Sequence, residues 1–139
     1  MSVTLPGCLD RWLEAPYVLV SGLDDVADSA PTGRNTIIVV GAAGLLEVDG
    51  SGAVTSLSPE PADAVTCNPD RIIIRQGDLI SWGPLPEPLA PFRSTGSAVL
   101  PSASDLQAWY DADVLVATPT GIVRLDTETG DQQTFGPPV

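Results

Sequence analysis

The sequence predicts an all-β fold built from antiparallel, blade-like meanders. Short runs of apolar, mostly β-branched residues alternate with turn signals rich in Gly, Asp and Thr, which is the pattern of strands joined by tight turns. The 13 glycines and 14 prolines among 139 residues are enough to interrupt any long helix. A strand–turn–strand pattern in the first half of the chain also recurs near its end, which indicates an internal repeat.

Length and composition are those of a single acidic domain. The 139 residues are enough to bury about two-thirds of the unfolded surface, and 43% of them are hydrophobic. The formal net charge of -12 repels the phosphate backbone and anionic membranes, so we expect neither a nucleic acid nor a membrane as a partner. All six basic residues are arginine, a bias that we attribute to a GC-rich genome rather than to the fold.

The chain is expected to have two parts, an N-terminal segment over residues 1–34 and a repeated β-hairpin or blade domain over residues 35–139. Within the N-terminal segment, the β-branched and aromatic run Tyr17–Val20 predicts one strand. The stretch Asp24–Arg34 is polar, contains Pro and Gly, and predicts an exposed loop.

No targeting or membrane-spanning segment is expected. Cys8, Asp10 and Arg11 stand where a signal peptide would have its basic cap and apolar core. The longest apolar run, Ile37–Leu46, is well short of the roughly 20 residues that cross a bilayer.

The first copy of the repeat predicts a three-stranded meander. Ile37–Val40 is an apolar strand, and Gly41–Gly44 is a tight turn. A second strand, Leu45–Val48, leads into the hairpin signal Asp49–Gly52. The third strand then covers Ala53–Leu57.

The second copy repeats this order near the end of the chain. Val114–Ala117 is the apolar strand, Thr118–Gly121 the turn, and Ile122–Leu125 the second strand. The turn Asp126–Gly130 and the strand Gln132–Phe135 follow. In the alignment of the two copies Gly44 matches Gly121, Leu45 matches Ile122, Val48 matches Leu125, Asp49 matches Asp126, Gly52 matches Gly130 after one insertion, and Leu57 matches Phe135.

A weaker unit lies between the two copies. Ile72–Ile74 is its apolar run, and Leu79–Trp82 is a returning strand after the turn Gln76–Asp78, which is predicted to be shorter than in the other copies. The three apolar runs start about 35 and about 42 residues apart, within the range of propeller blades. The proline-rich stretch Pro84–Pro91 cannot lie inside a sheet and predicts an extended surface loop.

These units resemble the blades of a β-propeller. Asp113–Gly130 is similar to the repeats of quinoprotein-like and YVTN-type propellers, in which a strand, a Gly turn, a second strand ending in Leu-Asp and a Thr-Gly turn follow in order. Thr36–Leu57 shares the pattern well and Ile72–Trp82 in part, so the resemblance covers about half of the chain. It implies a β-propeller-like architecture and no particular ligand, and the Trp-Asp and Gly-His signatures of another propeller family are absent.

Three blade-like units do not close a ring, because propellers usually have at least about four blades. Either several copies of the chain assemble, or a partner supplies the remaining blades, or the hairpins form a β-sandwich instead. We expect assembly, since unclosed ends present apolar faces and strand edges that favour association.

The residues available for chemistry favour a protein that is not an enzyme. There is no His and no Lys, which removes the usual general base, the commonest metal ligand and Schiff-base chemistry. Cys8 and Cys67 could pair or could be buried thiols. Asp126–Asp131 departs from the EF-hand spacing and matches the hairpin turn of the first copy, so no metal is expected there. We assign no catalytic residue and no cofactor; a glycosidase would need two facing carboxylates that the sequence does not place.

Four residues are candidates for binding. Trp82, Trp109 and Tyr110 have the residue types that line sugar-binding grooves, although both tryptophans are better explained as packing between blades. Arg93, which follows the proline-rich stretch, is a candidate interface contact.

The leading hypothesis is therefore a non-catalytic structural or interaction protein with protein partners, either a homo-oligomer or part of a larger assembly. Compactness, strong acidity and the Lys-free bias resemble the small virion proteins of phages of GC-rich bacteria, such as tail or decoration proteins, which implies a location in the virion and otherwise in the cytoplasm. The alternative is a propeller module that binds a carbohydrate or another ligand.

Overall fold

The protein consists of three four-stranded antiparallel sheets, which confirms the predicted all-β fold of blade-like meanders. The computed structural model describes residue 23 and residues 25–87, 90–110 and 112–136. These residues form twelve strands and no helix. Each sheet is a meander, so strands that are neighbours in the chain are neighbours in the sheet.

Each sheet takes four consecutive strands. The first sheet contains β1 (Val26–Pro31), β2 (Thr36–Gly41), β3 (Gly44–Asp49) and β4 (Val54–Ser58). The second sheet contains β5 (Ala64–Cys67), β6 (Arg71–Gln76), β7 (Leu79–Pro84) and β8 (Gly96–Val99). The third sheet contains β9 (Asp105–Ala108), β10 (Asp113–Thr118), β11 (Gly121–Asp126) and β12 (Gln132–Phe135).

The central hairpin of every sheet has the same length of turn. Gly41 pairs with Gly44 in the first sheet, Gln76 with Leu79 in the second and Thr118 with Gly121 in the third, which leaves two loop residues each time. The prediction of a shorter turn in the middle unit is therefore wrong. The position of the glycine suggested a shorter turn, because Gly77 is the first loop residue, whereas Gly44 and Gly121 come directly after the loop.

The predicted loop at residues 24–34 is also wrong, because most of it is strand β1. Ser29 pairs with Val39 of β2, and Pro31 ends the strand at the edge of the sheet. The sequence Val-Ala-Asp-Ser-Ala-Pro lacks the β-branched and aromatic residues of a typical strand, so its conformation comes from pairing rather than from propensity. The first sheet thus begins within the segment that was predicted to precede the repeats. The strand predicted at Tyr17–Val20 lies outside the described residues.

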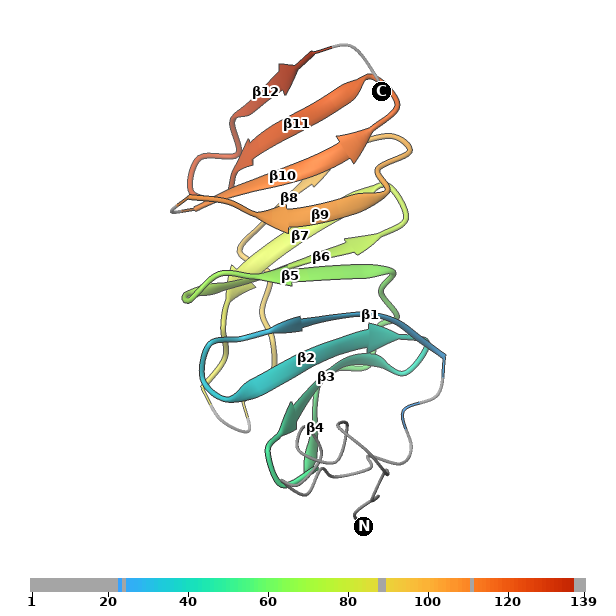
Figure 1. Ribbon diagram of the computed structural model, residues 1–139, viewed down its shortest axis with the longest axis vertical. Helices are drawn as coiled ribbons and strands as arrows, with labels where there is room; N and C mark the ends of the chain where they lie inside the picture. The colour runs from blue at the N-terminus through green and yellow to red at the C-terminus, as the bar shows by residue number, and fades with distance from the viewer. Residues whose placement is uncertain (1–22, 24, 88–89, 111, 137–139) are drawn as a thin grey trace, which may run out of the picture.

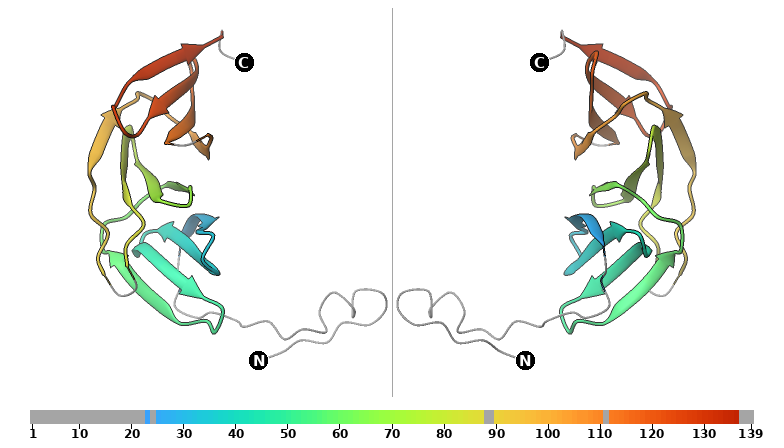
Figure 2. Two further views of the ribbon diagram at one scale, coloured as in Figure 1. Left: turned by 90° about the vertical axis from the view of Figure 1, so that its left-hand side faces the viewer. Right: turned by 90° about the vertical axis from the view of Figure 1, so that its right-hand side faces the viewer.

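The three sheets are stacked in sequence order along the long axis of the molecule (Figure 1). In side view they follow an arc, with β1, β5 and β9 on its concave side and β8 on its convex side (Figure 2). Two side chains tie these inner strands together. Asp28 accepts a 3.0 Å hydrogen bond from the amide of Val65, and Thr66 accepts one of 3.1 Å from the amide of Ala108.

The hydrophobic core is divided into two clusters, one in each space between neighbouring sheets. Between the first and second sheets lie Ala30, Ile38, Val40, Leu45, Leu57, Ala62, Val65, Ile72 and Ile74. Between the second and third sheets lie Ala64, Ile73, Ile80, Trp82, Leu100, Ala103, Leu106, Val114, Val116, Val123 and Leu125. The second sheet therefore buries both of its faces, and each end sheet buries one face against it.

The segment after β7 fastens the second sheet to the first. The amide of Phe92 donates a 2.9 Å hydrogen bond to the carbonyl of Leu57, and the Phe92 ring packs against the first core cluster. The guanidinium of Arg34 reaches the carbonyl of Pro86 at 2.7 Å. The prediction that Pro84–Pro91 lies outside the sheets is wrong at Pro84, which ends β7 opposite Arg71; the described residues 85–87 and 90–91 contain no strand. Leu85 and Phe92 of this segment pack against the first core cluster, so it does not lie only on the surface.

Candidate functional site

The outward face of the first sheet is apolar, and no other described sheet packs on it. Because side chains alternate along a strand, the residues next to the buried Ile38 and Val40 point to the opposite side. Register places Val48 between Ile37 and Val54, and Val39 beside Leu46. We call this set, Ile37, Val39, Leu46, Val48 and Val54, the first open face.

Two residues of the first open face are exposed, Ile37 at 49% and Val54 at 42%, whereas Val39, Leu46 and Val48 are only 8–9% exposed. Ile37 differs most clearly from its counterparts in the other two sheets. Equivalent positions in the three sheets are occupied by Ile37 of β2, Ile72 of β6 and Val114 of β10, each the second residue of its strand. Ile72 and Val114 are 0% exposed, whereas Ile37 is 49% exposed. At Ile37 the first sheet therefore carries a residue of the kind that packs between sheets, and no described sheet covers it.

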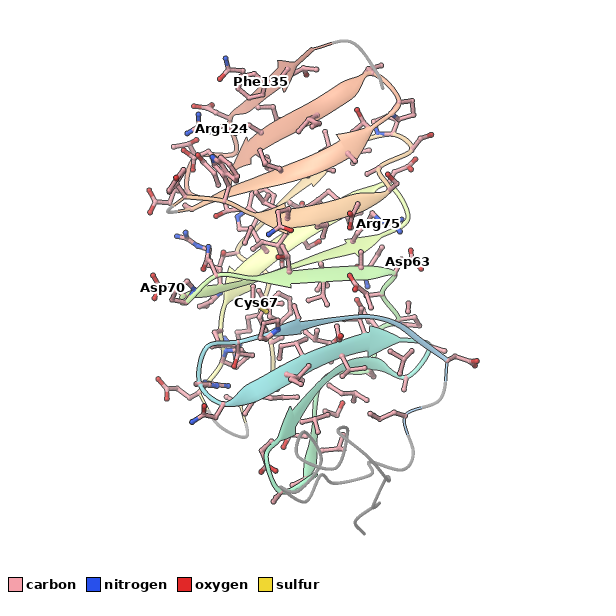
Figure 3. The ribbon with its side chains drawn as sticks, viewed as in Figure 1. Asp63, Cys67, Asp70, Arg75, Arg124 and Phe135 are labelled. Atoms are coloured by element: carbon pink, nitrogen blue, oxygen red, sulfur yellow. The ribbon has the colours of Figure 1, made fainter. Side chains whose placement is uncertain are left out.

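The outward face of the third sheet is the counterpart at the other end of the stack. Register places Ile122 between Ala117 and Phe135, and Leu115 beside Arg124. We call these five residues the second open face. Figure 3 shows Arg124 and Phe135 near the end of the stack that lies farthest from the first sheet.

Equivalent positions show the same contrast here. Ile122 corresponds to Leu45 and Ile80, which are both 0% exposed, yet Ile122 is 44% exposed. Phe135 matches Leu57 in the repeat; Leu57 is 2% exposed and Phe135 is 44% exposed. Each open face thus has two large apolar residues that are nearly half exposed, Ile37 and Val54 on the first and Ile122 and Phe135 on the second, and no described sheet is stacked on either face.

A polar pair occupies matching positions at the rim of the first and third sheets. In the third sheet the Arg124 guanidinium donates a 2.6 Å hydrogen bond to Asp113. In the first sheet Thr36 stands at the position of Asp113 and donates a 2.5 Å hydrogen bond to Glu47, which stands at the position of Arg124. Glu47 also forms an ion pair with Arg34 at 2.8 Å.

The charge of Glu47 is stabilised although its side chain is only 9% exposed. Burial is the largest single effect and raises the pKa of Glu47. Hydrogen bonds from Arg34 and Thr36 together outweigh it, so the pKa of this carboxyl lies below its ordinary value of 4.5. Glu47 is therefore an ionised structural group in the first interface between sheets.

The four candidate residues of the sequence do not form one site. Trp82 is 4% exposed and lies in the second core cluster, where Gly96 leaves room for its ring. Arg93 is exposed in the segment that follows β7. Trp109 and Tyr110 are 50% and 72% exposed, and their rings meet edge to face at 5.2 Å. The structure thus brings Trp109 and Tyr110 together at the turn before β10 and leaves Trp82 in the core.

The acidic turns are held by their own hydrogen bonds. Asp126 accepts hydrogen bonds from the amides of Glu128 and Thr129, and Asp49 accepts them from the amides of Ser51 and Ala53. Hydrogen bonding from Ser51 is the main reason why the pKa of Asp49 is lowered. Over the described part of the chain, no three His, Cys, Asp or Glu side chains are grouped to hold a metal ion.

Cys67 is a free thiol between the first and second sheets (Figure 3). Burial, with a smaller contribution from the charge of Glu47, raises the pKa of Cys67 to about 12. A thiol of this kind is a weak nucleophile and suits packing better than reaction. Cys8 lies outside the described residues.

Comparisons with known proteins support the fold and no more. No protein-family model matches the chain, and no curated protein matches it. The described residues contain no helix that is long and apolar enough to cross a membrane. Among solved structures, the chain is similar to the computationally designed Ika4 protein, with a TM-score of 0.62 at 14% identity over 88% of this chain and 80% of that one. At this identity the similarity shows a shared fold, so function has to be argued from the open faces themselves.

Proposed function

We propose that the chain is a non-catalytic structural or interaction protein that binds a protein partner through its two open faces. One observation carries this proposal: Ile37 and Phe135 are 49% and 44% exposed, whereas their counterparts in other sheets, Ile72 and Leu57, are 0% and 2% exposed. The absence of His and Lys from the sequence is in keeping with a role without catalysis.

The energetics favour covering these faces. Fully burying an Ile, Val or Phe side chain is worth about 1.5–3 kcal/mol, so covering one that is nearly half exposed gains about 1 kcal/mol. Ile37, Val54, Ile122 and Phe135 are each 42–49% exposed. Apolar side chains gathered on one sheet face mark an interaction surface, whereas isolated ones do not.

In this proposal the three sheets are blades of a β-propeller-like ring that the partner completes. The stacking of four-stranded meanders in an arc, with the first strand of each sheet on the concave side, supports this architecture (Figure 2). A sandwich-like stack, closed by one partner sheet on each open face, is the alternative.

More specifically, we propose that the assembly is a phage particle and that the chain is a tail or decoration component of it. The compact, acidic and Lys-free sequence supports this role. The protein should then co-purify with intact particles at a fixed stoichiometry. Its absence from purified particles would contradict a virion role and would leave the open faces to another partner.

The experiment that tests the proposed function is site-specific photo-crosslinking in the cells that produce the protein. A benzophenone side chain at position 37 or 135 should form crosslinked adducts with protein. The matched control is position 99, since Val99 is also a strand residue and is 65% exposed, but it lies on the second sheet, away from both open faces. Adducts from neither open face, or equal adducts from position 99, would contradict the proposal.

The exposed pair Trp109 and Tyr110 favours a second candidate function, the binding of a carbohydrate or another flat ligand. Two adjacent aromatic rings that are at least half exposed can stack on a sugar. Tryptophan fluorescence should then change on titration with simple sugars, and Trp109→Ala should abolish the change. A silent titration together with a blank glycan array would contradict this function.

A further inference from the structure

We infer that the partner is a second copy of this chain, bound head to tail, so that the first open face of each copy packs on the second open face of the other. This inference rests on the proposed function, because it names the partner of the same two faces. The resulting dimer would contain six sheets in one ring.

The pairing follows from the interfaces that already exist inside the chain. The first sheet presents Ile38 and Val40 to the face of the second sheet that carries Ile72 and Ile74. The second sheet in turn presents Ile73 and Ile80 to the face of the third sheet that carries Val114 and Val116. Each interface therefore joins two different kinds of face.

The two open faces are one of each kind. Ile37 and Val39 of the first open face correspond to Ile72 and Ile74, the residues of the second sheet that pack against the first sheet. Leu115 and Ile122 of the second open face correspond to Ile73 and Ile80, the residues that the second sheet presents to the third. Only the contact between a first and a second open face repeats the internal interface. A contact between two first open faces would not.

The number of sheets favours two copies. Propellers typically have four to eight four-stranded blades around a central channel. With three sheets in the described chain, two copies give six blades, whereas three copies give nine, which is outside that range. A ring of two copies has a two-fold axis, so both contacts between copies are identical and no open face remains.

Charge does not prevent this contact locally. Arg124 of the second open face is already paired with Asp113, so covering it leaves no unpaired charge. The first open face consists of Ile, Val and Leu side chains only. The formal net charge of -12 on each copy opposes association at long range, so added salt should strengthen the dimer.

Three variants of the full chain test the inference by sedimentation. Ile37→Asp alters only the first open face, Phe135→Asp only the second, and Val99→Asp is the control on the second sheet. The replaced side chains are 44–65% exposed, so each variant should fold, which circular dichroism checks. The wild-type chain and Val99→Asp should form dimers. Ile37→Asp and Phe135→Asp should each raise the dissociation constant by about 100-fold or more, because each places an unpaired carboxylate in an apolar interface.

An equimolar mixture of Ile37→Asp and Phe135→Asp distinguishes the modes of pairing. In a head-to-tail dimer of one copy of each, one of the two contacts has both faces unaltered, so the mixture should associate more tightly than either variant alone. In a dimer that joins like faces, both contacts of the mixed dimer carry a carboxylate, and mixing would give no gain. Such a result would overturn the inference.

A monomeric wild-type chain at all concentrations and salt levels would also overturn the inference. The proposed function would still stand if positions 37 and 135 crosslinked to a different protein in cells, and would fall if they crosslinked to nothing. A dimer that is unaffected by both single variants would mean that another surface joins the copies, which contradicts the inference as well.

Discussion

Arg34 holds Glu47 with two hydrogen bonds, from Nε to Oε2 at 3.0 Å and from Nη2 to Oε1 at 2.8 Å. The pair lies where the first and second sheets meet, since the same guanidinium also donates to the carbonyl of Pro86. Arg34 is 31% exposed and Glu47 only 9%. The nearly buried Glu47 carboxylate therefore needs Arg34 to balance its charge, whereas water can still solvate part of the Arg34 guanidinium.

Replacing Arg34 by alanine should lower the free energy of unfolding by about 2 kcal/mol. Losing one partner of a buried ion pair typically costs about 3–5 kcal/mol, and the partial exposure of Arg34 reduces that figure. Urea denaturation gives the measurement. Arg93→Ala is the control because Arg93 is an exposed arginine in the segment that packs beside this pair, and its effect should stay below about 0.5 kcal/mol. Equal effects of the two variants would show that the Arg34–Glu47 pair contributes little.

The pKa of Glu47 also predicts a loss of stability in acid. Because its folded-state pKa is below 4.5, the unfolded chain takes up a proton at a higher pH than the folded chain does. The stabilisation is complete above the ordinary value of 4.5 and is lost as the pH falls through the folded-state pKa. In Glu47→Gln the fall of stability below this value should be shallower than in the wild type. Parallel curves of unfolding free energy against pH would contradict this assignment.

Gly83→Ala should be strongly destabilising, by about 2–3 kcal/mol or more. A Cβ atom at Gly83 would lie 2.0 Å from the carbonyl oxygen of Arg93, so the segment after β7 could not stay against the second sheet. Gly50→Ala is the matched control, as nothing lies within 4 Å of its added Cβ. The difference between the two melting temperatures is the measurement. A neutral Gly83→Ala would mean that residues 92–95 do not lie over β7.

Cys67 should react slowly with thiol reagents in the folded protein. A pKa of about 12, against the usual 9.0, leaves roughly 1000-fold fewer thiolates near neutral pH. In a Cys8→Ser background, the reaction with a disulfide reagent should accelerate at least 100-fold when the chain is unfolded in urea. Equal rates in the folded and unfolded chains would contradict the burial of this thiol.

The hairpins could be predicted from the sequence because their strands have clear propensity. The runs at Ile37, Ile72 and Val114 are β-branched, and the turns between them are marked by Gly, Asp and Thr. The first strand of each sheet could not be predicted in the same way. β5 and β9 have only four residues each, and β1 and β9 carry Asp within or at the start of the strand, so the conformation of these strands depends on partners that are distant in sequence or follow a loop.

The candidate site was predictable only in part. The repeat alignment indicated that the ends of the stack would be unclosed, and it matched Phe135 with Leu57. It could not show which face of each end sheet lacks a neighbour, because exposure depends on the order of the sheets and not on local sequence. Aromatic residue type was a poor guide for the same reason, as Trp82 packs between sheets whereas Trp109 is half exposed.

Hydroxyl-radical footprinting of the wild-type chain tests most directly whether the open faces are covered. Side-chain labelling at Ile37 and Phe135 is compared, relative to the unfolded chain, with the buried Leu57 and the exposed Val99. On concentration Ile37 and Phe135 should become as protected as Leu57, while Val99 stays reactive, and dilution should reverse the change. Labelling of Ile37 and Phe135 at the rate of Val99 under all conditions, or protection that does not depend on concentration, would contradict the account.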